Sequence, residues 1–262
     1  MTPAAPDAEL RAAAAMVFVE DLDSPELSEE DAHHLGEVLR LRPGETVAAS
    51  DGAGAWRMCA FSSSGAPSRR SAGGRSSPPR YGLEVSGPVQ VSLRRSPTLE
   101  IGLSWAKTER TEWAVAKLAE LGVDVVTPLV TDRTVVRPDL GASPRRELRL
   151  RRIVREAAMQ SRRAVIPEIG PTQSLDAVLG RSRAGETALA EPGGGPVSLA
   201  TPVVLVGPEG GWSDRELALV ANKVSLGDGI LRVETAAVVA GALLTVLRTM
   251  ASAPPSWAAP TP

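Results

Sequence analysis

One stretch of the chain decides the fold: Val203-Val204-Leu205-Val206-Gly207-Pro208-Glu209-Gly210-Gly211-Trp212. Its four leading apolar residues are typical of a buried strand, and the Gly-Pro-Glu-Gly-Gly segment is typical of a tight turn. A helix is expected to begin directly afterwards, because Ser213 and Glu216 have the spacing of a capping box. The stretch therefore predicts a strand, a glycine-rich loop and a helix in immediate succession.

A second glycine-rich loop repeats this design nearer the C-terminus. Val224-Ser225-Leu226 precedes Gly227-Asp228-Gly229, and Ile230 to Thr235 lead into a helix expected from about Ala236 to about Met250. Ligands of open α/β sheets lie at the carboxyl ends of strands, where both loops would stand. Glycine lets backbone groups approach a ligand because it has no Cβ. The two loops therefore predict a pocket of main-chain atoms, suited to a small cofactor with a purine and an amino-acid tail.

Neither loop carries a common nucleotide-binding motif. Both lack the Gly-Lys-Ser/Thr of a P-loop and the spaced glycines of a Rossmann turn. From the residues alone two interpretations stay open. One is a phosphate site at the N-terminus of the helix after Ser213, and the other is a tight turn that binds nothing.

The two loops together resemble the signature of the RsmE family, the 16S ribosomal RNA (uracil-N3)-methyltransferases of the SPOUT superfamily. The matching residues are Gly-Pro-Glu-Gly-Gly at 207–211, then Leu226-Gly227, then Ile230-Leu231-Arg232-x-Glu234-Thr235-Ala236. The resemblance implies an α/β fold with an N-terminal small β-barrel (PUA-like) domain. It also implies a C-terminal SPOUT α/β domain with a parallel sheet and a trefoil knot. In the family this knot holds S-adenosylmethionine.

The resemblance carries over to individual positions and to domain boundaries. The expected cofactor-binding residues are Leu205, Val206, Gly207, Glu209, Gly210, Gly211, Leu226, Gly227, Ile230, Leu231, Glu234 and Thr235. The expected domains are a disordered N-terminal extension (1–15), a PUA-like RNA-binding β domain (16–94) with a flexible insertion (62–80), a SPOUT methyltransferase domain (98–250) and a disordered tail (251–262).

Composition favours a cytoplasmic protein that uses neither metal nor disulfide. Of 262 residues 43% are hydrophobic but only 3% aromatic, so the core must consist mainly of aliphatic side chains. Cys59 is the only cysteine, which excludes an internal disulfide, and we expect it to be buried. His33 and His34 are the only histidines, and adjacent helical side chains point apart, so no metal site is expected. We see no signal peptide and no apolar run long enough to cross a membrane.

The N-terminal part predicts a small β domain. Short strands are expected at Val17–Val19, Thr46–Ala49 and Trp56–Phe61, with turn signals between them. His-Leu-x-x-Val-Leu-Arg followed by Arg-Pro-Gly, at positions 34–44, resembles the RNA-binding domain of the same family. The insertion at 62–80 is rich in Ser, Gly, Pro and Arg and too poor in apolar residues to fold alone.

The larger domain begins with a strand–helix–strand pattern. A strand is expected at Leu99–Trp105 and a helix from Lys107 to Gly122, where glycine is a natural C-cap. Val123–Val130 is a nearly continuous apolar run, typical of a parallel strand buried on both faces. The pattern predicts a right-handed βαβ unit. Thr187–Ala190 is expected to be a strand that ends in a flexible glycine turn at 193–195.

A basic helix is expected after Ser143 and Pro144, which suit its N-cap and first position. Its arginines are open to two interpretations, a solvated face or a track for phosphates. The family match Arg-Glu-Ala-Ala-x-Gln-Ser-x-Arg at 155–163 favours RNA contact. By resemblance, the residues expected to contact RNA are His34, Arg40, Arg42, Lys107, Arg133, Arg137, Arg155, Gln160, Arg162 and Arg163.

The resemblance implies that the substrate is a uridine of 16S ribosomal RNA in the small subunit, and that the enzyme is a homodimer. The reactive form of uridine N3 is the anion, which a nearby cation would stabilise. Arg232 is the candidate catalytic cation, and its structural alternative is an ion pair with Glu234 or Glu209. The target uridine must be flipped out or unpaired, and no general base is assigned.

The chain departs from the family pattern at three places. Asp228-Gly229 stands where a basic residue is usual, Met16-Val17 replaces an arginine before the first aromatic, and the insertion at 62–80 has no usual counterpart. Three alternatives stay open: a ribose 2′-O-methyltransferase of the same superfamily, a non-catalytic RNA-binding protein and a nucleotide-phosphate enzyme. The interpretation as a methyltransferase requires Gly210 and Gly227 to share one cavity.

Overall fold

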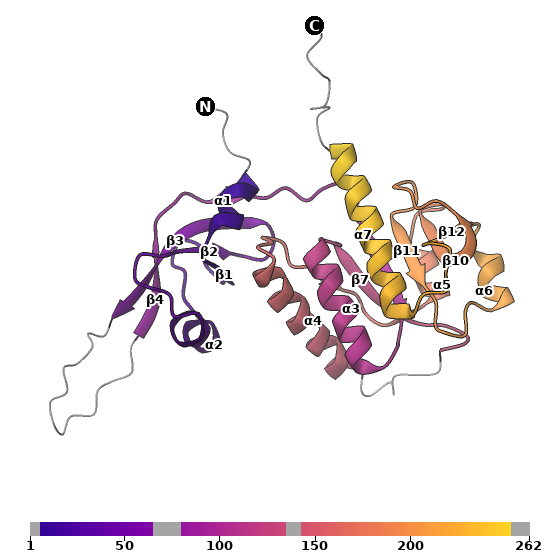
Figure 1. Cartoon of the computed structure of the whole chain (residues 1–262), viewed down its shortest axis with the longest axis horizontal. Helices are drawn as coiled ribbons and strands as arrows, with labels where there is room; N and C mark the ends of the chain where they lie inside the picture. Colours follow the sequence, from indigo (N-terminus) through magenta and orange to yellow (C-terminus); the bar gives the residue numbers. More distant parts are fainter. Residues whose placement is uncertain (1–5, 65–79, 135–142, 253–262) are drawn as a thin grey trace, which may run out of the picture. The chain divides into compact units, whose positions relative to one another are not determined.

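The computed structural model describes residues 6–64, 80–134 and 143–252. The chain divides into two compact units (Figure 1). The N-terminal unit comprises Met1–Arg94 together with Ala158–Ile166, and the C-terminal unit comprises Arg95–Ala157 together with Pro167–Pro262. A nine-residue segment distant in sequence, 158–166, therefore belongs to the N-terminal unit.

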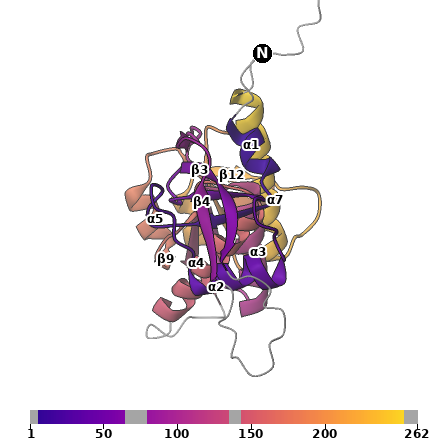
Figure 2. The ribbon, with the colours of Figure 1, turned by 90° about the vertical axis from the view of Figure 1, so that its left-hand side faces the viewer.

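The N-terminal unit is built on a five-stranded mixed sheet. Its strands are β1 (Ala15–Phe18), β2 (Thr46–Ser50), β3 (Ala55–Ser64), β4 (Arg80–Val85) and β5 (Gln90–Val91). Its short helices are α1 (Pro6–Ala12), α2 (Glu29–His33) and the π-helical turn η1 (His34–Val38). β1 pairs with β2 in parallel, whereas β3 pairs antiparallel with β2, β4 and β5. Figure 2 shows β3 and β4 side by side.

Buried apolar side chains cover both faces of this sheet. One cluster includes Trp56 and Phe18 and is completed by Ala158 and Ala164 from the returning segment. The other includes Leu35 and the fully buried Cys59, whose pKa is raised by burial. Cys59 is thus a core residue, as its surroundings in the sequence predict.

Two expectations for the N-terminal unit are wrong in part. Residues 6–15 are not disordered, because α1 brings Leu10 and Ala13 into the core, where they are 2% and 6% exposed. The expected insertion is shorter than 62–80, because Ser62–Ser64 and Arg80 are paired in β3 and β4. Residues 65–79 lie outside the described part of the chain.

The C-terminal unit is an α/β domain with a seven-stranded parallel sheet. Its strands are β6 (Glu100–Ser104), β7 (Val125–Val130), β8 (Glu168–Ile169), β9 (Gln173–Ser174), β10 (Thr187–Gly195), β11 (Val203–Val206) and β12 (Asn222–Val224). The order is β12-β10-β11-β6-β7-β8, and β9 also pairs with β7. Its helices are α3 (Thr108–Leu121), α4 (Ser143–Gln160), α5 (Leu175–Arg181), α6 (Asp214–Leu219) and α7 (Val233–Ser252).

The predicted βαβ unit is present as β6-α3-β7. Adjacent β6 and β7 run parallel, and α3 ends at Gly122 in the left-handed conformation, whose N–H donates to the carbonyls of Leu118 and Ala119. Both strands are apolar because neighbouring elements cover them. Figure 1 shows α3 and α7 side by side, and α7 also packs against β6 and β11.

Helix α7 corrects the expectation that no apolar run is long enough to cross a membrane. By length and composition alone its 20 residues are enough to cross a membrane, although we expected no such run. Its buried Arg248, however, pairs with Asp124 and donates to the carbonyl oxygens of Gly122 and Pro97. The helix therefore belongs to the core of the C-terminal unit.

The glycines at 193–195 form strand rather than the expected flexible turn. β10 continues to Gly195, with a shift of its register against β12 between Ala190 and Gly195. A Cβ at Gly194 would lie 2.7 Å from backbone atoms of Val224. Glycine is needed there because the backbone of β12 passes too close for any side chain.

Candidate functional site

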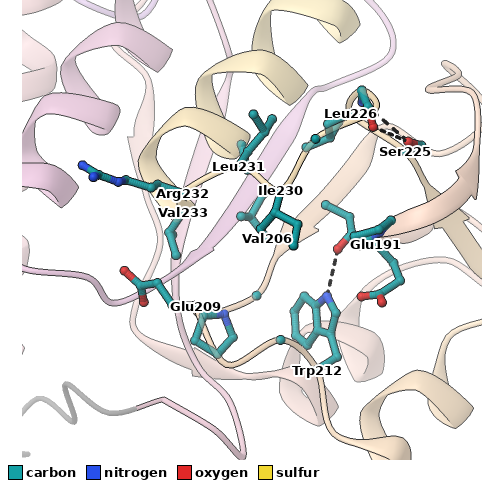
Figure 3. A pocket seen from close by; sticks show the side chains of 18 of the residues that line it. Glu191, Val206, Glu209, Trp212, Ser225, Leu226, Ile230, Leu231, Arg232 and Val233 are labelled. Atoms are coloured by element: carbon teal, nitrogen blue, oxygen red, sulfur yellow. Dashed lines mark hydrogen bonds between the residues drawn. The ribbon is translucent and has the colours of Figure 1, made fainter.

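A cavity of about 440 Å³ opens after the ends of β11 and β12 and beside the middle of β10 (Figure 3). Gly210 of the first glycine loop and Gly227 of the second both line it, as the interpretation as a methyltransferase requires. The complete lining is Ala190, Glu191, Pro192, Val206, Gly207, Pro208, Glu209, Gly210, Gly211, Trp212, Ser225, Leu226, Gly227, Gly229, Ile230, Leu231, Arg232, Val233 and Ala236. Two loops that are separate in sequence therefore form the walls of a single cavity.

Three of the residues expected to bind the cofactor do not line this cavity. Leu205 is fully buried within β11 and packs in an apolar cluster. Glu234 and Thr235 line a neighbouring cavity of about 320 Å³, together with Glu109, Arg110 and Trp113. For Leu205 the physical reason is strand alternation, since its side chain points into the core.

Sequence reasoning missed the contribution of β10. Ala190, Glu191 and Pro192 line the cavity because β10 lies between β11 and β12 in the sheet. Figure 3 shows Glu191 near Trp212 at the same end of the cavity. The Gly193-Gly194-Gly195 run directly after Pro192 was a signal that a backbone comes close at this point.

Trp212 shapes the first glycine loop. Its indole Nε1 donates a hydrogen bond to the carbonyl oxygen of Ala190 at 3.1 Å, which joins the loop to β10. The ring lies against Gly207, where a Cβ would come within 2.9 Å of Trp212 Cε2. Gly207 is therefore required by the close approach of an aromatic ring.

The predicted capping box is present and is connected to another loop. Ser213 accepts a hydrogen bond from the N–H of Glu216, and the Glu216 carboxylate accepts one from the N–H of Ser213. Glu216 is fully buried and also accepts from the N–H of Asp132 at 3.0 Å. The cavity loop is thus held by the segment that follows β7.

Asp132 is the centre of an ionic cluster beside this loop. Arg215 donates to both of its carboxylate oxygens and also to Asp176, and Ser213 Oγ donates to it as well. The hydrogen bonds from Arg215, followed by the one from Ser213, hold the pKa of Asp132 below its usual value. The next residue, Arg133, donates to the carbonyl oxygen of Gly210 at 3.0 Å.

Arg232, the expected catalytic cation, lines the cavity and is exposed. Figure 3 shows its guanidinium directed away from Val206 and Trp212. Glu209 and Glu234 face Arg110 instead, at 3.8 Å and 3.5 Å. Within the described ranges no ion pair involves Arg232, so the pair with Glu209 or Glu234 that was its structural alternative is not formed there.

The residues expected to contact RNA fall in both units. His34, Arg40 and Arg42 are exposed on the π-helical turn and the residues after it. Arg40 has a φ of 54°, which is uncommon for a non-glycine residue. Gln160, Arg162 and Arg163 belong to the same unit.

Arg162 has a structural role that the sequence did not indicate. Its guanidinium donates to the backbone carbonyl oxygens of Ala13, Ala14 and Met159, and burial lowers its pKa. In the C-terminal unit, Lys107 is exposed and Arg155 partly buried. Arg137 lies outside the described residues.

No group of three or more His, Cys, Asp or Glu residues that could hold a metal ion occurs in the described ranges. The cavity offers main-chain atoms, the carboxylates of Glu191 and Glu209, the guanidinium of Arg232, the hydroxyl of Ser225 and apolar side chains. These groups suit a small organic molecule that has both an apolar ring and polar substituents.

Comparison with known proteins gives consistent matches over most of the chain. A family model described as an RNA methyltransferase domain matches residues 94–245, and one described as an RNA methyltransferase PUA domain matches residues 27–66. The chain is 32% identical to the ribosomal RNA small subunit methyltransferase E of Mycobacterium tuberculosis, over 83% of this chain and 84% of that protein. The protein of the same name from Synechocystis is also 32% identical, over 84% and 72%.

Two solved structures resemble about nine tenths of the chain. One is the ribosomal RNA small subunit methyltransferase E of Neisseria gonorrhoeae bound to S-adenosyl methionine, with a TM-score of 0.69 and 26% identity over 89% of this chain and 97% of that one. The other is a putative methyltransferase from Legionella pneumophila in complex with the same cofactor, with a TM-score of 0.71 and 27% identity over 90% and 97%.

Proposed function

The chain belongs to the ribosomal RNA small subunit methyltransferase E (RsmE) family, and on that premise we propose that it methylates N3 of a specific uridine in 16S ribosomal RNA with S-adenosylmethionine as donor. The observation that carries the proposal is the single cavity shared by the loops of Gly210 and Gly227. In a family of RNA methyltransferases, such a main-chain pocket is the natural place for the methyl donor. A trefoil knot around these loops is part of the proposal, because members of the family have one.

The cavity fits S-adenosylmethionine in size and chemistry. Its volume of about 440 Å³ is within the range of roughly 300–1,000 Å³ that small-ligand sites occupy. Val206, Leu226 and Trp212 provide apolar walls for the adenine, and the Glu191 carboxylate can accept hydrogen bonds from hydroxyl or ammonium groups. When bound, the cofactor supplies an electrophilic methyl group on a positively charged sulfur.

Positioning is the main contribution that the protein can make to such a reaction. The cavity walls hold the donor, and a cation near the uracil oxygens stabilises the charge that forms on the ring. Arg232 is the proposed cation, because it is exposed at the cavity and forms no ion pair in the described ranges. Arg232→Ala is expected to bind S-adenosylhomocysteine normally but to lose turnover, and unchanged turnover would remove Arg232 from the mechanism.

The proposal extends to the substrate and to the assembly. The substrate is the small ribosomal subunit or its 16S RNA, which would be reached in the cytoplasm. The RNA contacts are proposed at the exposed residues His34, Arg40, Arg42 and Lys107. A homodimer is proposed because Leu243, Val246 and Met250 leave an apolar face of α7 exposed by 40%, 55% and 70%. Sedimentation velocity measures the oligomeric state directly.

The experiment that tests the function combines methylation with nucleoside analysis. Small subunits lacking base methylation are incubated with the protein and S-adenosylmethionine, and the 16S RNA is digested for mass spectrometry. The expected product is 3-methyluridine at one position. In a separate experiment, calorimetry measures the binding of S-adenosylhomocysteine to the protein. A 2′-O-methyl nucleoside would identify a ribose methyltransferase. Salt-dependent RNA binding without cofactor affinity would identify a non-catalytic RNA-binding protein.

A further inference from the structure

A second cavity lies beside the proposed cofactor cavity. It measures about 320 Å³ and is lined by Glu109, Arg110 and Trp113 of α3 and by Glu234 and Thr235 of α7. Arg232, Val233 and Ala236 line the first cavity, so adjacent residues at the start of α7 line both cavities. Arg110 of the second cavity also pairs with Glu209 of the first, so the two cavities are neighbours.

The walls of the second cavity suit a planar ring with polar edges. Trp113 is 47% exposed, although a tryptophan on a helix is usually covered by neighbouring side chains. An accessible indole is a stacking surface for a nucleobase. Thr235 is exposed and adds a hydroxyl group. The combination of an aromatic ring with polar groups is typical of sites that bind an unpaired base.

Arg110 is the cation among the residues that line this cavity, and the carboxylates of Glu109 and Glu234 line it too. Its side chain is 35% exposed, and the carboxylates of Glu209 and Glu234 lie 3.8 Å and 3.5 Å from it. Within the described part of the chain its guanidinium donates no hydrogen bond to another residue. A guanidinium has five N–H donors, so Arg110 is held in place by two carboxylates while its donors stay available for a ligand.

We propose that this second cavity binds the target uracil, with the ring stacked on Trp113 and a carbonyl oxygen next to N3 bonded to Arg110. The inference rests on the proposed function and assigns it a base-binding site. Arg110 acts here in addition to Arg232, the cation proposed above, and donates to one of the two carbonyl oxygens that share the negative charge once N3 has lost its proton. The proton passes to water at the open side of the cavity, and the electron pair left on N3 forms the bond to the methyl carbon. The electron pair of the broken carbon–sulfur bond stays on sulfur.

Binding to RNA tests the base site apart from catalysis. The probe is a labelled RNA hairpin with one unpaired uridine, titrated in the presence of S-adenosylhomocysteine, against the same hairpin with adenosine at that position. Trp113→Ala is expected to weaken uridine binding about ten- to a hundredfold, the range of one lost stacking contact. Trp113→Phe keeps a ring and should restore most of the affinity. The matched charge control is Arg183→Gln, because Arg183 has an 88% exposed side chain, lies in the same unit and lines neither cavity.

The pH dependence of methylation tests the role of Arg110. Arg110→Gln should lower the rate at neutral pH and move the rise of the pH–rate profile to higher pH, because the uracil anion loses one of its cations. Arg110→Lys keeps the positive charge and should recover part of the shift. The affinity for S-adenosylhomocysteine should stay the same in every variant, since none of these residues lines the first cavity.

Three results would overturn the inference. The first is that both Trp113→Ala and Arg110→Gln bind the uridine hairpin and methylate RNA as the natural protein does. The second is that Arg110→Gln loses affinity for S-adenosylhomocysteine as strongly as for RNA, since Arg110 would then only brace Glu209. The third is that the Trp113 variants change the sedimentation coefficient in step with activity, since Trp113 would then contact a second copy. If the natural protein forms no 3-methyluridine, the proposed function fails, and the hairpin titrations still decide whether the cavity binds a base.

Discussion

The guanidinium of Arg133 donates a hydrogen bond to the carbonyl oxygen of Gly210 at 3.0 Å, across 77 residues of sequence. The contact joins the segment after β7 to the loop that lines the cofactor cavity. The Cβ of Arg133 lies 3.6 Å from the position that a Cβ of Gly210 would take, so the side chain also packs over this loop. The resemblance implies that Arg133 contacts RNA, whereas its position is suited to holding the cofactor loop.

Arg133→Ala is therefore expected to weaken S-adenosylhomocysteine binding about two- to tenfold, which corresponds to the net loss of one hydrogen bond. Calorimetry measures this change, and Arg183→Ala is the matched control, because Arg183 lies outside both cavities. If Arg133→Ala weakened RNA binding while cofactor affinity stayed unchanged, Arg133 would instead be an RNA contact.

Gly207→Ala is expected to damage the cofactor cavity. The added Cβ would lie 2.9 Å from the Trp212 ring, and Trp212 is held by its bond to Ala190. Overpacking of this kind costs about 1–3 kcal/mol, which corresponds to a loss of cofactor affinity of about five- to a hundredfold. Gly180→Ala is the matched control, since nothing lies within 4 Å of its Cβ position and its backbone is helical. Equal cofactor affinity in both variants would show that the Trp212 ring can move without consequence.

Arg248→Met is expected to destabilise the C-terminal unit. Arg248 and Asp124 form a buried ion pair with side chains 7% and 13% exposed, and Arg248 also bonds two backbone carbonyl oxygens. Removing one partner of such a pair costs about 3–5 kcal/mol, because the other charge remains buried. The free energy of unfolding in urea measures the loss. Arg152→Met is the control, since its pair with Glu156 is 63% and 60% exposed, and a change of at most about 0.5 kcal/mol is expected there. Equal losses in the two variants would contradict the prediction.

The lowered pKa of Asp132 predicts how the free energy of unfolding depends on pH in the acid range. Its hydrogen bonds from Arg215 and Ser213 lower its pKa in the folded protein below the ordinary value of 3.8. A depressed pKa stabilises the folded state above the unfolded value, and this contribution disappears as the pH falls through the folded value. The difference in unfolding free energy between the natural protein and Asp132→Asn should thus be constant at neutral pH and shrink below pH 3.8. Urea titrations at several pH values measure it, and a difference that grows on acidification would reverse the sign.

Local signals in the sequence predicted the elements that surround the site. Glycine after an apolar run, the spacing of Ser213 and Glu216, and the C-cap at Gly122 each depend on residues a few positions apart. Such signals act through the backbone and need no knowledge of the rest of the chain. They were therefore enough to predict both glycine loops, the βαβ unit and the basic helix.

Only the tertiary structure decided which distant residues meet. The order of the sheet places β10 between β11 and β12, which brings Glu191 to the cavity and leaves Leu205 in the core. The pairing of Arg110 with Glu209 and Glu234 depends on how α3 packs against α7. The sequence by itself determined the two glycine loops, because these follow from local backbone freedom, and the cofactor expected there came from the resemblance to the family. Strand order and ion-pair partners were decided by packing, because it brings together side chains whose contacts no local pattern records.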